Sequence, residues 1–384
     1  MGKSSATFYA AHLLSCVLQG EQPEKKPQDV SWEEVFDILN RNDVACTAYP
    51  ALERLKREGV KDLPGAQMLE KWQQIYHVAI VKEVTFDQDR EKLLASFEKE
   101  GISYMPMKGI LLKAYYPSIG LRSFADNDIL YDAAKMKEVK AIMEGMGYTT
   151  KSYGKGNHDI YQKPPMLNFE LHRSLTGVTC AFKSYTDQAW DRAVKDKDNA
   201  FGYHMTKEDF YIYFVIHAHK HYSNLGTGIR TLLDQYLYLE REGRELNWKY
   251  VNGEFAKLGL NGFESELRGL GKLLFGEQGK KELSARQEEL LGYLASQGTY
   301  GTVSNGIRQR IQKKGEDGNL RKAKQRYVLE RIFPSKEVLQ SENPILGNYP
   351  FLYPVIVVKR WFHVFFRWKR IKNEIEIVKK MDRL

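Results

Sequence analysis

Residues 104–132 read YMPMKGILLKAYYPSIGLRSFADNDILYD, and the alternation of apolar runs with turn residues in this stretch decides the expected fold. Short apolar runs bounded by turn residues are typical of strands, whereas Pro and Gly end helices. The expected elements are a strand, a turn, a helix ended by proline, and a second strand, at residues 102–107, 108–109, 110–116 and 126–131. This order indicates a small sheet that includes a strand-to-helix turn.

Two aspartates stand at the start of the second expected strand. Asp126 and Asp128 are separated by one residue, so both side chains project from the same face of a strand. Like charges in an apolar segment repel each other, and their burial costs further free energy. A solvated turn is the alternative for such a triplet, but the apolar flanks favour a divalent cation such as Mg²⁺, which prefers carboxylate and phosphate oxygens. The pair predicts metal-dependent phosphoryl or nucleotidyl transfer, and Asn127 has no assigned role.

The turn at Lys108 and Gly109 supplies complementary positive charge. A glycine-containing turn from a strand into a helix leaves backbone N–H groups free to bind a phosphate. Arg122 precedes the aspartates by a few residues, and its guanidinium suits either a phosphate or a carboxylate. Two interpretations of Arg122 therefore remain: a phosphate contact, or an ion pair with a carboxylate such as Asp126 or Asp128.

A third carboxylate would complete a site for two metal ions. Glu170 lies in the strand-like run MLNFELH at 166–172, and His172 shares its face of that strand. In two-metal transfer, one ion activates the attacking hydroxyl and both stabilise the transferring phosphoryl group. We expect Asp126 and Asp128 to bind both ions and Glu170 to bind the ion nearer the acceptor. An exposed position at a strand edge is the alternative for Glu170.

With these residues in place, the chain resembles the uncharacterised nucleotidyltransferase family of the DNA polymerase β-like nucleotidyltransferase superfamily. The resemblance covers residues 92–238 and, more loosely, the region from Phe333 onward. The residues that match are Lys108, Gly109, Arg122, Asp126, Asp128 and Glu170. The chain departs from the superfamily pattern where Lys-Gly replaces the common Gly-Ser, so a serine contact to phosphate is missing.

The resemblance implies a Mg-dependent nucleotidyltransferase that transfers a nucleoside monophosphate from a nucleoside triphosphate to an acceptor hydroxyl and releases pyrophosphate. It implies two Mg²⁺ ions, with Asp126, Asp128 and Glu170 as the catalytic and metal-binding residues. It also implies a set of nucleotide-binding residues, namely Lys108, Gly109, Arg122, Lys220 and His221. The family's helical block further resembles the segment that carries His217, Lys220 and His221, followed by Arg230 and Asp234.

The histidines of this block share a helix face, because His217 and His221 are four residues apart. Zinc is not expected, because the glutamate of the zinc-protease motif is missing and no third ligand has a suitable spacing. The block either packs against the sheet or faces the cleft and contacts the nucleotide. Arg230 and Asp234 are also four residues apart, and we expect a salt bridge between them.

Composition indicates an ordinary globular protein. The chain has 384 residues, of which 42% are hydrophobic and 28% charged, and its net charge of +9 suits triphosphates or nucleic acid. Three widely spaced cysteines, Cys16, Cys46 and Cys180, indicate a reducing compartment, and we expect a cytoplasmic protein. The apolar N-terminus reads as an amphipathic helix instead of a signal peptide, and no apolar run is long enough to span a bilayer.

We expect an α+β fold, in which a small mixed β-sheet nucleotidyltransferase core is embedded between N- and C-terminal helical regions. The predicted regions are 1–100 for the N-terminal helices, 101–200 for the core and 201–384 for the C-terminal helices. Further strands are predicted at 148–151 and 158–162, and helices at 207–222 and 230–242. The aromatic and basic tail at 357–384 reads as an amphipathic helix.

Three alternative functions stay open. An RNA nucleotidyltransferase would use the basic segment 308–326 to grip its substrate. A toxin-like enzyme would modify a protein or tRNA. A non-catalytic helical binding module would retain only a vestigial site. The sequence leaves the acceptor, the preferred base and the oligomeric state open.

Overall fold

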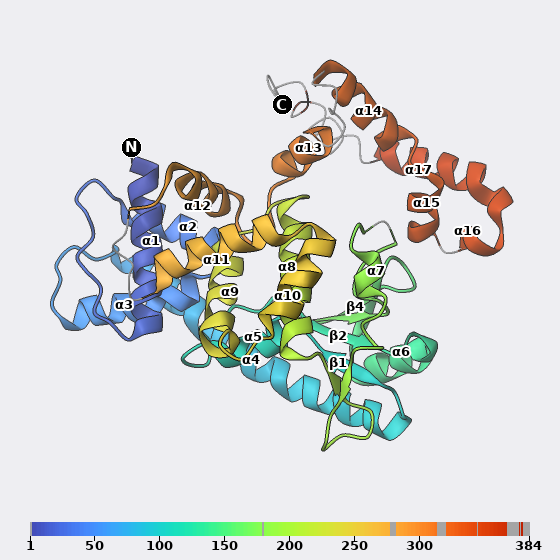
Figure 1. The fold of residues 1–384 in the computed structure, drawn as a ribbon, viewed down its shortest axis with the longest axis horizontal. Helices are drawn as coiled ribbons and strands as arrows, with labels where there is room; N and C mark the ends of the chain where they lie inside the picture. The colour runs from blue at the N-terminus through green and yellow to red at the C-terminus, as the bar shows by residue number, and fades with distance from the viewer. Residues whose placement is uncertain are drawn as a thin grey trace.

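The computed structural model describes residues 2–178, 180–276, 282–312, 320–343 and 345–366, together with Glu376 and Val378. A five-stranded mixed sheet lies between helices that come before and after it in the chain (Figure 1). The predicted α+β class is therefore confirmed. The helices before the sheet are α1 (Gly2–Gln19), α2 (Trp32–Arg41), α3 (Ala45–Arg57) and α4 (Ala66–Glu100).

The sheet has the strand order β1-β2-β5-β4-β3. Its strands are β1 (Tyr104–Pro106), β2 (Asn127–Tyr131), β3 (Thr149–Ser152), β4 (His158–Lys163) and β5 (Leu167–His172). Only β2 and β5 pair in parallel, and the other three pairs are antiparallel. This topology places β2, which begins directly after Asp126 and contains Asp128, beside the strand that carries Glu170.

Short helices connect the strands, and a second small sheet follows them. The connecting elements are α5 (Gly109–Leu112), the 3-10 turns η1 (Lys113–Tyr115) and η2 (Ala133–Lys135), and α6 (Met136–Gly145). The predicted helix at 110–116 is thus one α-turn followed by one 3-10 turn. After the sheet come α7 (Lys183–Thr186) and the two-stranded ribbon of β6 (Val194–Lys195) and β7 (Tyr203–His204).

The second half of the chain is helical. Its longer helices are α8 (Lys207–Tyr222), α9 (Ile229–Glu242), α10 (Trp248–Leu258), α11 (Asn261–Phe275) and α12 (Ala285–Gln297). The C-terminal helices lie apart from the others in Figure 1 and comprise α13 (Val303–Gln312), α14 (Leu320–Ile332), α15 (Lys336–Glu342), α16 (Ile345–Asn348), η3 (Pro350–Leu352) and α17 (Tyr353–Phe366). Most of the predicted amphipathic tail at 357–384 lies outside the described residues.

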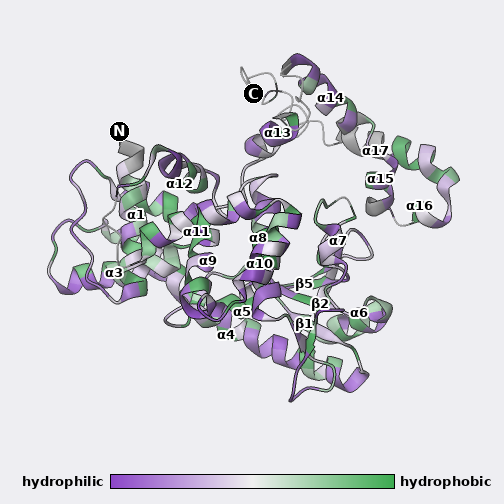
Figure 2. Ribbon diagram, viewed as in Figure 1, coloured by the Kyte–Doolittle hydropathy of each residue, from purple (hydrophilic) through white to green (hydrophobic). Residues whose placement is uncertain are grey.

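The first helix is buried and not amphipathic, which corrects the expectation for the N-terminus. Leu13 and Leu14 are fully buried, as is Ala10 on the same helix, and only a narrow stripe of α1 is partly exposed. Figure 2 shows hydrophobic residues along α1 where it meets its neighbours. The reason is that α1 packs against helices from both ends of the chain, namely α2, α3, α11 and α12. Hydrophobic burial on several faces replaces the single apolar stripe of a surface helix.

Helix α4 links this helical core to the sheet. Near its start Trp72 packs in the helical core, whereas Phe86 and Phe97 pack with the apolar face of the sheet. Gly101 ends the helix in the left-handed conformation (φ 64°), which glycine adopts without steric strain. Among the described helices, none is long and apolar enough to cross a membrane.

Candidate active site

A cavity of about 370 Å³ lies between the edge of the sheet, the turn at Lys108 and helix α8. It gathers residues from β2, β4, β5, α8 and α9, although these elements span more than a hundred positions of the sequence. The charged and polar residues that line it include all those predicted from the sequence, namely Lys108, Gly109, Arg122, Asp126, Asp128, Glu170, Lys220 and His221. The fold therefore brings every predicted site residue to one cavity.

The three predicted carboxylates converge in this cavity. Asp128 on β2 lies directly opposite Glu170 on β5 in the parallel register, and Asp126 immediately precedes β2. One oxygen from each of the three carboxylates lies within 4.8 Å of the other two. Burial, followed by repulsion from Asp128, raises the pKa of Asp126 to about 6. Burial, followed by repulsion from the two aspartates, raises the pKa of Glu170 to about 7. A bound cation would relieve repulsion of this kind, so the cluster is a candidate cation site.

Lys108 provides the positive charge nearest to the cluster. Its Nζ lies 2.5 Å from Oδ1 of Asp128, and Nε2 of His172 lies 2.7 Å from the same oxygen. Burial opposes ionisation of Asp128, but Lys108 and His172 outweigh it and hold the pKa of Asp128 well below its usual range. Lys108 also has a positive φ of 50°, which is strained for a residue with a side chain. The strained turn places the lysine ammonium on the carboxylate.

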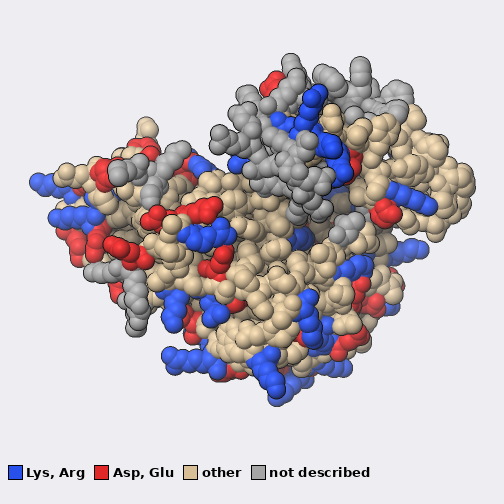
Figure 3. Space-filling model, turned by 45° about the horizontal axis from the view of Figure 1, so that its top comes forward, with Lys and Arg blue, Asp and Glu red and all other residues tan. Residues whose placement is uncertain are grey.

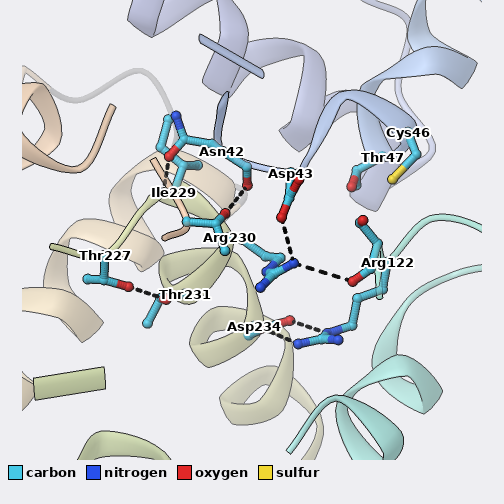
Figure 4. A network of polar contacts seen from close by, with 12 residues as sticks. Asn42, Asp43, Cys46, Thr47, Arg122, Thr227, Ile229, Arg230, Thr231 and Asp234 are labelled. Atoms are coloured by element: carbon cyan, nitrogen blue, oxygen red, sulfur yellow. Dashed lines mark hydrogen bonds and ion pairs between the residues drawn. The ribbon is translucent and has the colours of Figure 1, made fainter. Parts of the chain in front are cut away.

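Gly109 lets Arg122 approach the turn closely. A Cβ atom at Gly109 would lie 2.5 Å from Nη1 of Arg122, so any side chain there would displace the guanidinium. Nε and Nη2 of Arg122 each donate a 2.9 Å hydrogen bond to Asp234 (Figure 4). Nη1 of Arg122 consequently remains beside Gly109, on the wall of the cavity.

The salt bridge that we predicted between Arg230 and Asp234 is wrong. Asp234 pairs instead with Arg122, and its Oδ1 also accepts a hydrogen bond from the hydroxyl of Tyr116 at 2.8 Å. Arg230 pairs with Asp43 in the turn between α2 and α3, at 3.2 Å (Figure 4). Helix α9 packs between two parts of the chain, so its charged side chains bind tertiary partners instead of each other. Arg122 does form an ion pair with a carboxylate, but neither Asp126 nor Asp128 is the partner.

The face of α8 that looks into the cavity carries His217, Lys220 and His221. Burial, followed by repulsion from Lys108, lowers the pKa of Lys220 and moves that of His217 well below its usual value. Burial and the neighbouring Lys220 lower the pKa of His221 to about 4. His219 lies on another face of the helix, where its ring packs against Phe182 and Phe263. The cleft-facing interpretation thus agrees with the positions of these three side chains.

Several cavity residues were missed from the sequence. His158 on β4 lies opposite His172 on β5 in the antiparallel register, and this pairing would have been needed to find it. Tyr213 lines the cavity four residues before His217, and its hydroxyl has no hydrogen-bond partner among the described residues.

The side chain of Asn127 is fully buried, and its Oδ1 accepts a 3.2 Å hydrogen bond from Arg90 on α4. Asn127 therefore ties β2 to the long helix.

Comparisons with known proteins identify the family of the chain. A family model described as "Uncharacterised nucleotidyltransferase" matches residues 28–276, which is more than half of the chain. Among solved structures, the chain is similar to "Solution Structure of Antibiotic-Resistance Factor ANT(2'')-Ia Reveals Substrate-Regulated Conformation Dynamics". That similarity has 11% identity and a TM-score of 0.35, and covers 48% of this chain and 97% of the other. No curated protein matches the chain.

Proposed function

Because the chain belongs to the uncharacterised nucleotidyltransferase family, we propose that it transfers a nucleoside monophosphate from a nucleoside triphosphate to an acceptor hydroxyl. Family membership supports nucleotidyl transfer in general, and pyrophosphate is the second product of the reaction proposed here. The observation that carries the proposal is the convergence of Asp126, Asp128 and Glu170 within 4.8 Å in a cavity. Three carboxylates at this separation, with Asp128 buried and the other two partly buried, repel each other unless a cation is bound.

The donor set fits Mg²⁺, because all three side chains offer carboxylate oxygens. Asp126 and Asp128 would hold two Mg²⁺ ions, and Glu170 would hold the ion nearer the acceptor. The ions, when bound, lower the pKa of the attacking hydroxyl and neutralise charge on the transferring phosphoryl group. We also assign to Glu170 the removal of a proton from the acceptor hydroxyl.

Positive groups beside the carboxylates would bind the triphosphate. Lys108 neutralises Asp128 in the metal-free protein, and a bound cation would free its ammonium to contact a phosphate. The amide of Gly109 and Nη1 of Arg122 lie next to each other on the same side of the cavity. Since Arg122 stays anchored on Asp234, its guanidinium offers charge without having to reorient.

Helix α8 supplies the second group of contacts. Lys220 and His221 line the cavity across from the carboxylates, and burial lowers the pKa values of both. A polyanion bound in the cavity favours the charged forms of these side chains. We therefore assign Lys220 and His221 to the bound nucleotide.

A nucleic acid is a second candidate acceptor, and the C-terminal helices favour it. Five arginine or lysine side chains on α13 and α14 are exposed, namely Arg308, Arg310, Arg321, Lys322 and Arg326. Figure 3 shows Lys and Arg side chains gathered on the C-terminal helices. Residues 313–319 of the predicted basic segment lie outside the described residues. An RNA acceptor predicts binding that weakens steeply with salt.

The test is calorimetric titration of the purified protein with each nucleoside triphosphate, with and without Mg²⁺. Binding that requires Mg²⁺ and is lost in Asp126→Asn and Asp128→Asn would support the donor site and identify the base. Labelled nucleotide and a pyrophosphate assay would then identify the acceptor. If no triphosphate binds in the presence of Mg²⁺, the enzyme proposal is rejected in favour of a helical binding module.

A further inference from the structure

A second group of metal-type ligands overlaps the carboxylate cluster on the same face of the sheet. His158 on β4 is the register partner of His172 on β5, and Glu170 lies two residues before His172. Side chains at these positions project from one face, because alternate strand residues share a face. One ligand atom from each of His158, Glu170 and His172 lies within 4.8 Å of the other two.

The distances are too long for hydrogen bonds but suit a bridging ion. Oε2 of Glu170 lies 3.7 Å from Nε2 of His158 and 3.9 Å from Nε2 of His172, and hydrogen bonds between such atoms are 2.7–3.2 Å long. Ligands that bind an ion at about 2.0–2.2 Å are separated from each other by about 2.9–3.5 Å. The two separations from Glu170 exceed this range by less than an ångström, and all three donors lie within 4.8 Å of one another, so small shifts would place them on one ion.

We propose that His158, Glu170 and His172 form a binding site for a transition-metal ion of the Zn²⁺ class. Two imidazole nitrogens and one carboxylate favour Zn²⁺, Co²⁺ or Ni²⁺ over Mg²⁺, which prefers oxygen donors. The site shares only Glu170 with the carboxylates assigned to Mg²⁺. The inference stands on the geometry of the three ligands and does not require the proposed reaction.

The surroundings of the two histidines fit this assignment. The side-chain amide of Asn157 lies 3.3 Å from Nδ1 of His172, so this ring is oriented with Nε2 toward the carboxylates. Nδ1 of His158 has no hydrogen-bond partner among the described residues, so no such bond fixes this ring. His158 can therefore turn its Nε2 onto an ion without breaking an existing hydrogen bond. Nε2 of His172 is hydrogen-bonded to Oδ1 of Asp128 at 2.7 Å, so an ion bound at this nitrogen would take the place of that hydrogen bond.

The test is titration of the metal-free full-length protein with Co²⁺, followed by visible absorption. We expect one saturable equivalent with the spectrum of nitrogen-ligated Co²⁺, which an equal concentration of Mg²⁺ does not displace. Loss of an outer-shell partner weakens metal binding by about 10–100-fold, so loss of the ligand in His158→Gln should weaken it by at least about 100-fold. The matched control is His204→Gln, which removes an exposed histidine paired with Asp196, and it should bind Co²⁺ like the wild type.

Equal Co²⁺ affinity in His158→Gln and wild type would overturn the proposal, as would displacement of Co²⁺ by equimolar Mg²⁺. A measurement on the wild type alone avoids dependence on the folding of a variant. Zn²⁺ should shift the ring ¹⁵N signals of two histidines in NMR spectra, and a shift of fewer than two would also overturn it. Co²⁺ binding without nucleotide turnover would reject the proposed reaction and leave this site standing, whereas Mg²⁺-dependent turnover without Co²⁺ binding would do the reverse.

Discussion

Two groups of charged side chains line the same cavity, and they differ in how their charges are balanced. In one group, Asp234 accepts two hydrogen bonds from Arg122 and one from Tyr116, so both of its oxygens are bonded. In the other group, the pKa values of Asp126 and Glu170 are raised to about 6 and about 7 by burial and by neighbouring carboxylates. Side chains of the protein balance the charge of Asp234 but leave excess negative charge at Asp126 and Glu170.

This difference in charge balance distinguishes residues that hold the fold together from residues that we propose to bind a ligand. A buried ion pair with complete hydrogen bonding fixes the position of α9 against the loop that carries Arg122. A carboxylate cluster with excess negative charge destabilises the metal-free fold and is retained only if a ligand compensates it. Charge balance therefore distinguishes an anchoring residue such as Asp234 from a ligand-binding residue such as Asp126.

The largest expected effect is the loss of turnover when a carboxylate of the unbalanced group is replaced. Asp126→Asn and Asp128→Asn should each lower nucleotidyl transfer by at least about 1000-fold, because several kcal/mol of charge stabilisation is lost with the metal. In Asp126→Asn the free energy of unfolding of the metal-free protein should stay the same or rise, because repulsion is relieved. Pyrophosphate release and urea denaturation measure the two quantities. Substantial turnover in both variants would reject the metal assignment.

Substitutions in the balanced group of Arg122, Asp234 and Tyr116 should mainly lower the free energy of unfolding. Asp234→Asn leaves the guanidinium of Arg122 buried without a counter-charge, and such a change lowers the free energy of unfolding by about 3–5 kcal/mol. Tyr116→Phe, which removes one hydrogen bond to the same carboxylate, should lower it by only about 1 kcal/mol. Urea denaturation of the metal-free proteins compares the three. Wild-type stability in Asp234→Asn would remove the distinction between the two groups.

These two groups were not equally visible in the sequence. The two aspartates at the start of the apolar run in 126–131 and the alternation of side chains in 167–172 are local features, so both strands and the shared face of the two aspartates could be predicted from them. The helix at 207–222 was also predicted. The parallel register that places Asp128 opposite Glu170 follows from the topology, which the superfamily resemblance implied.

The balanced group could not be predicted in the same way. Arg122 and Asp234 are separated by 112 positions, and nothing in the local pattern around either residue identifies the other. The helical spacing of Arg230 and Asp234 favoured an incorrect local pair, because intrahelical spacing carries no information about tertiary partners. His158 was missed for a similar reason, since its role depends on the strand pairing that brings it to His172.

The pH dependence of the free energy of unfolding gives a further test of the comparison between the two charged groups. Since the pKa values of Asp126 and Glu170 are raised in the folded protein, the folded state retains protons that the unfolded chain releases above about pH 4–4.5. The contribution of these two groups to the free energy of unfolding is fully present below their pKa values in the unfolded chain, and it is lost as the pH rises through about 6 and 7. Buried histidines of lowered pKa, His217 and His221 among them, act in the opposite direction over this range, so the effect must be measured against a variant that keeps them. Relative to Glu170→Gln, the free energy of unfolding of the metal-free wild type should fall by on the order of 2 kcal/mol between about pH 5 and 8. Urea denaturation in chelator measures this slope.

Glu170→Gln is the reference for the pH series because it lacks one of the two carboxyl groups of raised pKa and keeps every histidine. Asp128 does not contribute within this range, because its lowered pKa places its effect in more acidic solution. Addition of Mg²⁺ at pH 8 should restore stability in the wild type. A metal-free wild type whose stability rises relative to Glu170→Gln from pH 5 to 8 would contradict the assignment of excess negative charge to this group.

The smallest effect is expected at the ion pair of Arg230 with Asp43. This pair tests whether an ion pair must be buried to stabilise the fold. The side chains are 15% and 27% exposed, whereas those of Arg122 and Asp234 are 8% and 5% exposed. Partly exposed pairs contribute about 0.2–1 kcal/mol, so Asp43→Asn should lower the free energy of unfolding by no more than about 1 kcal/mol. Turnover should change by no more than a small factor, because Arg230 keeps its charge at the cavity. A loss near that of Asp234→Asn would place Arg230 and Asp43 in the balanced group and show that exposure is a poor guide to it.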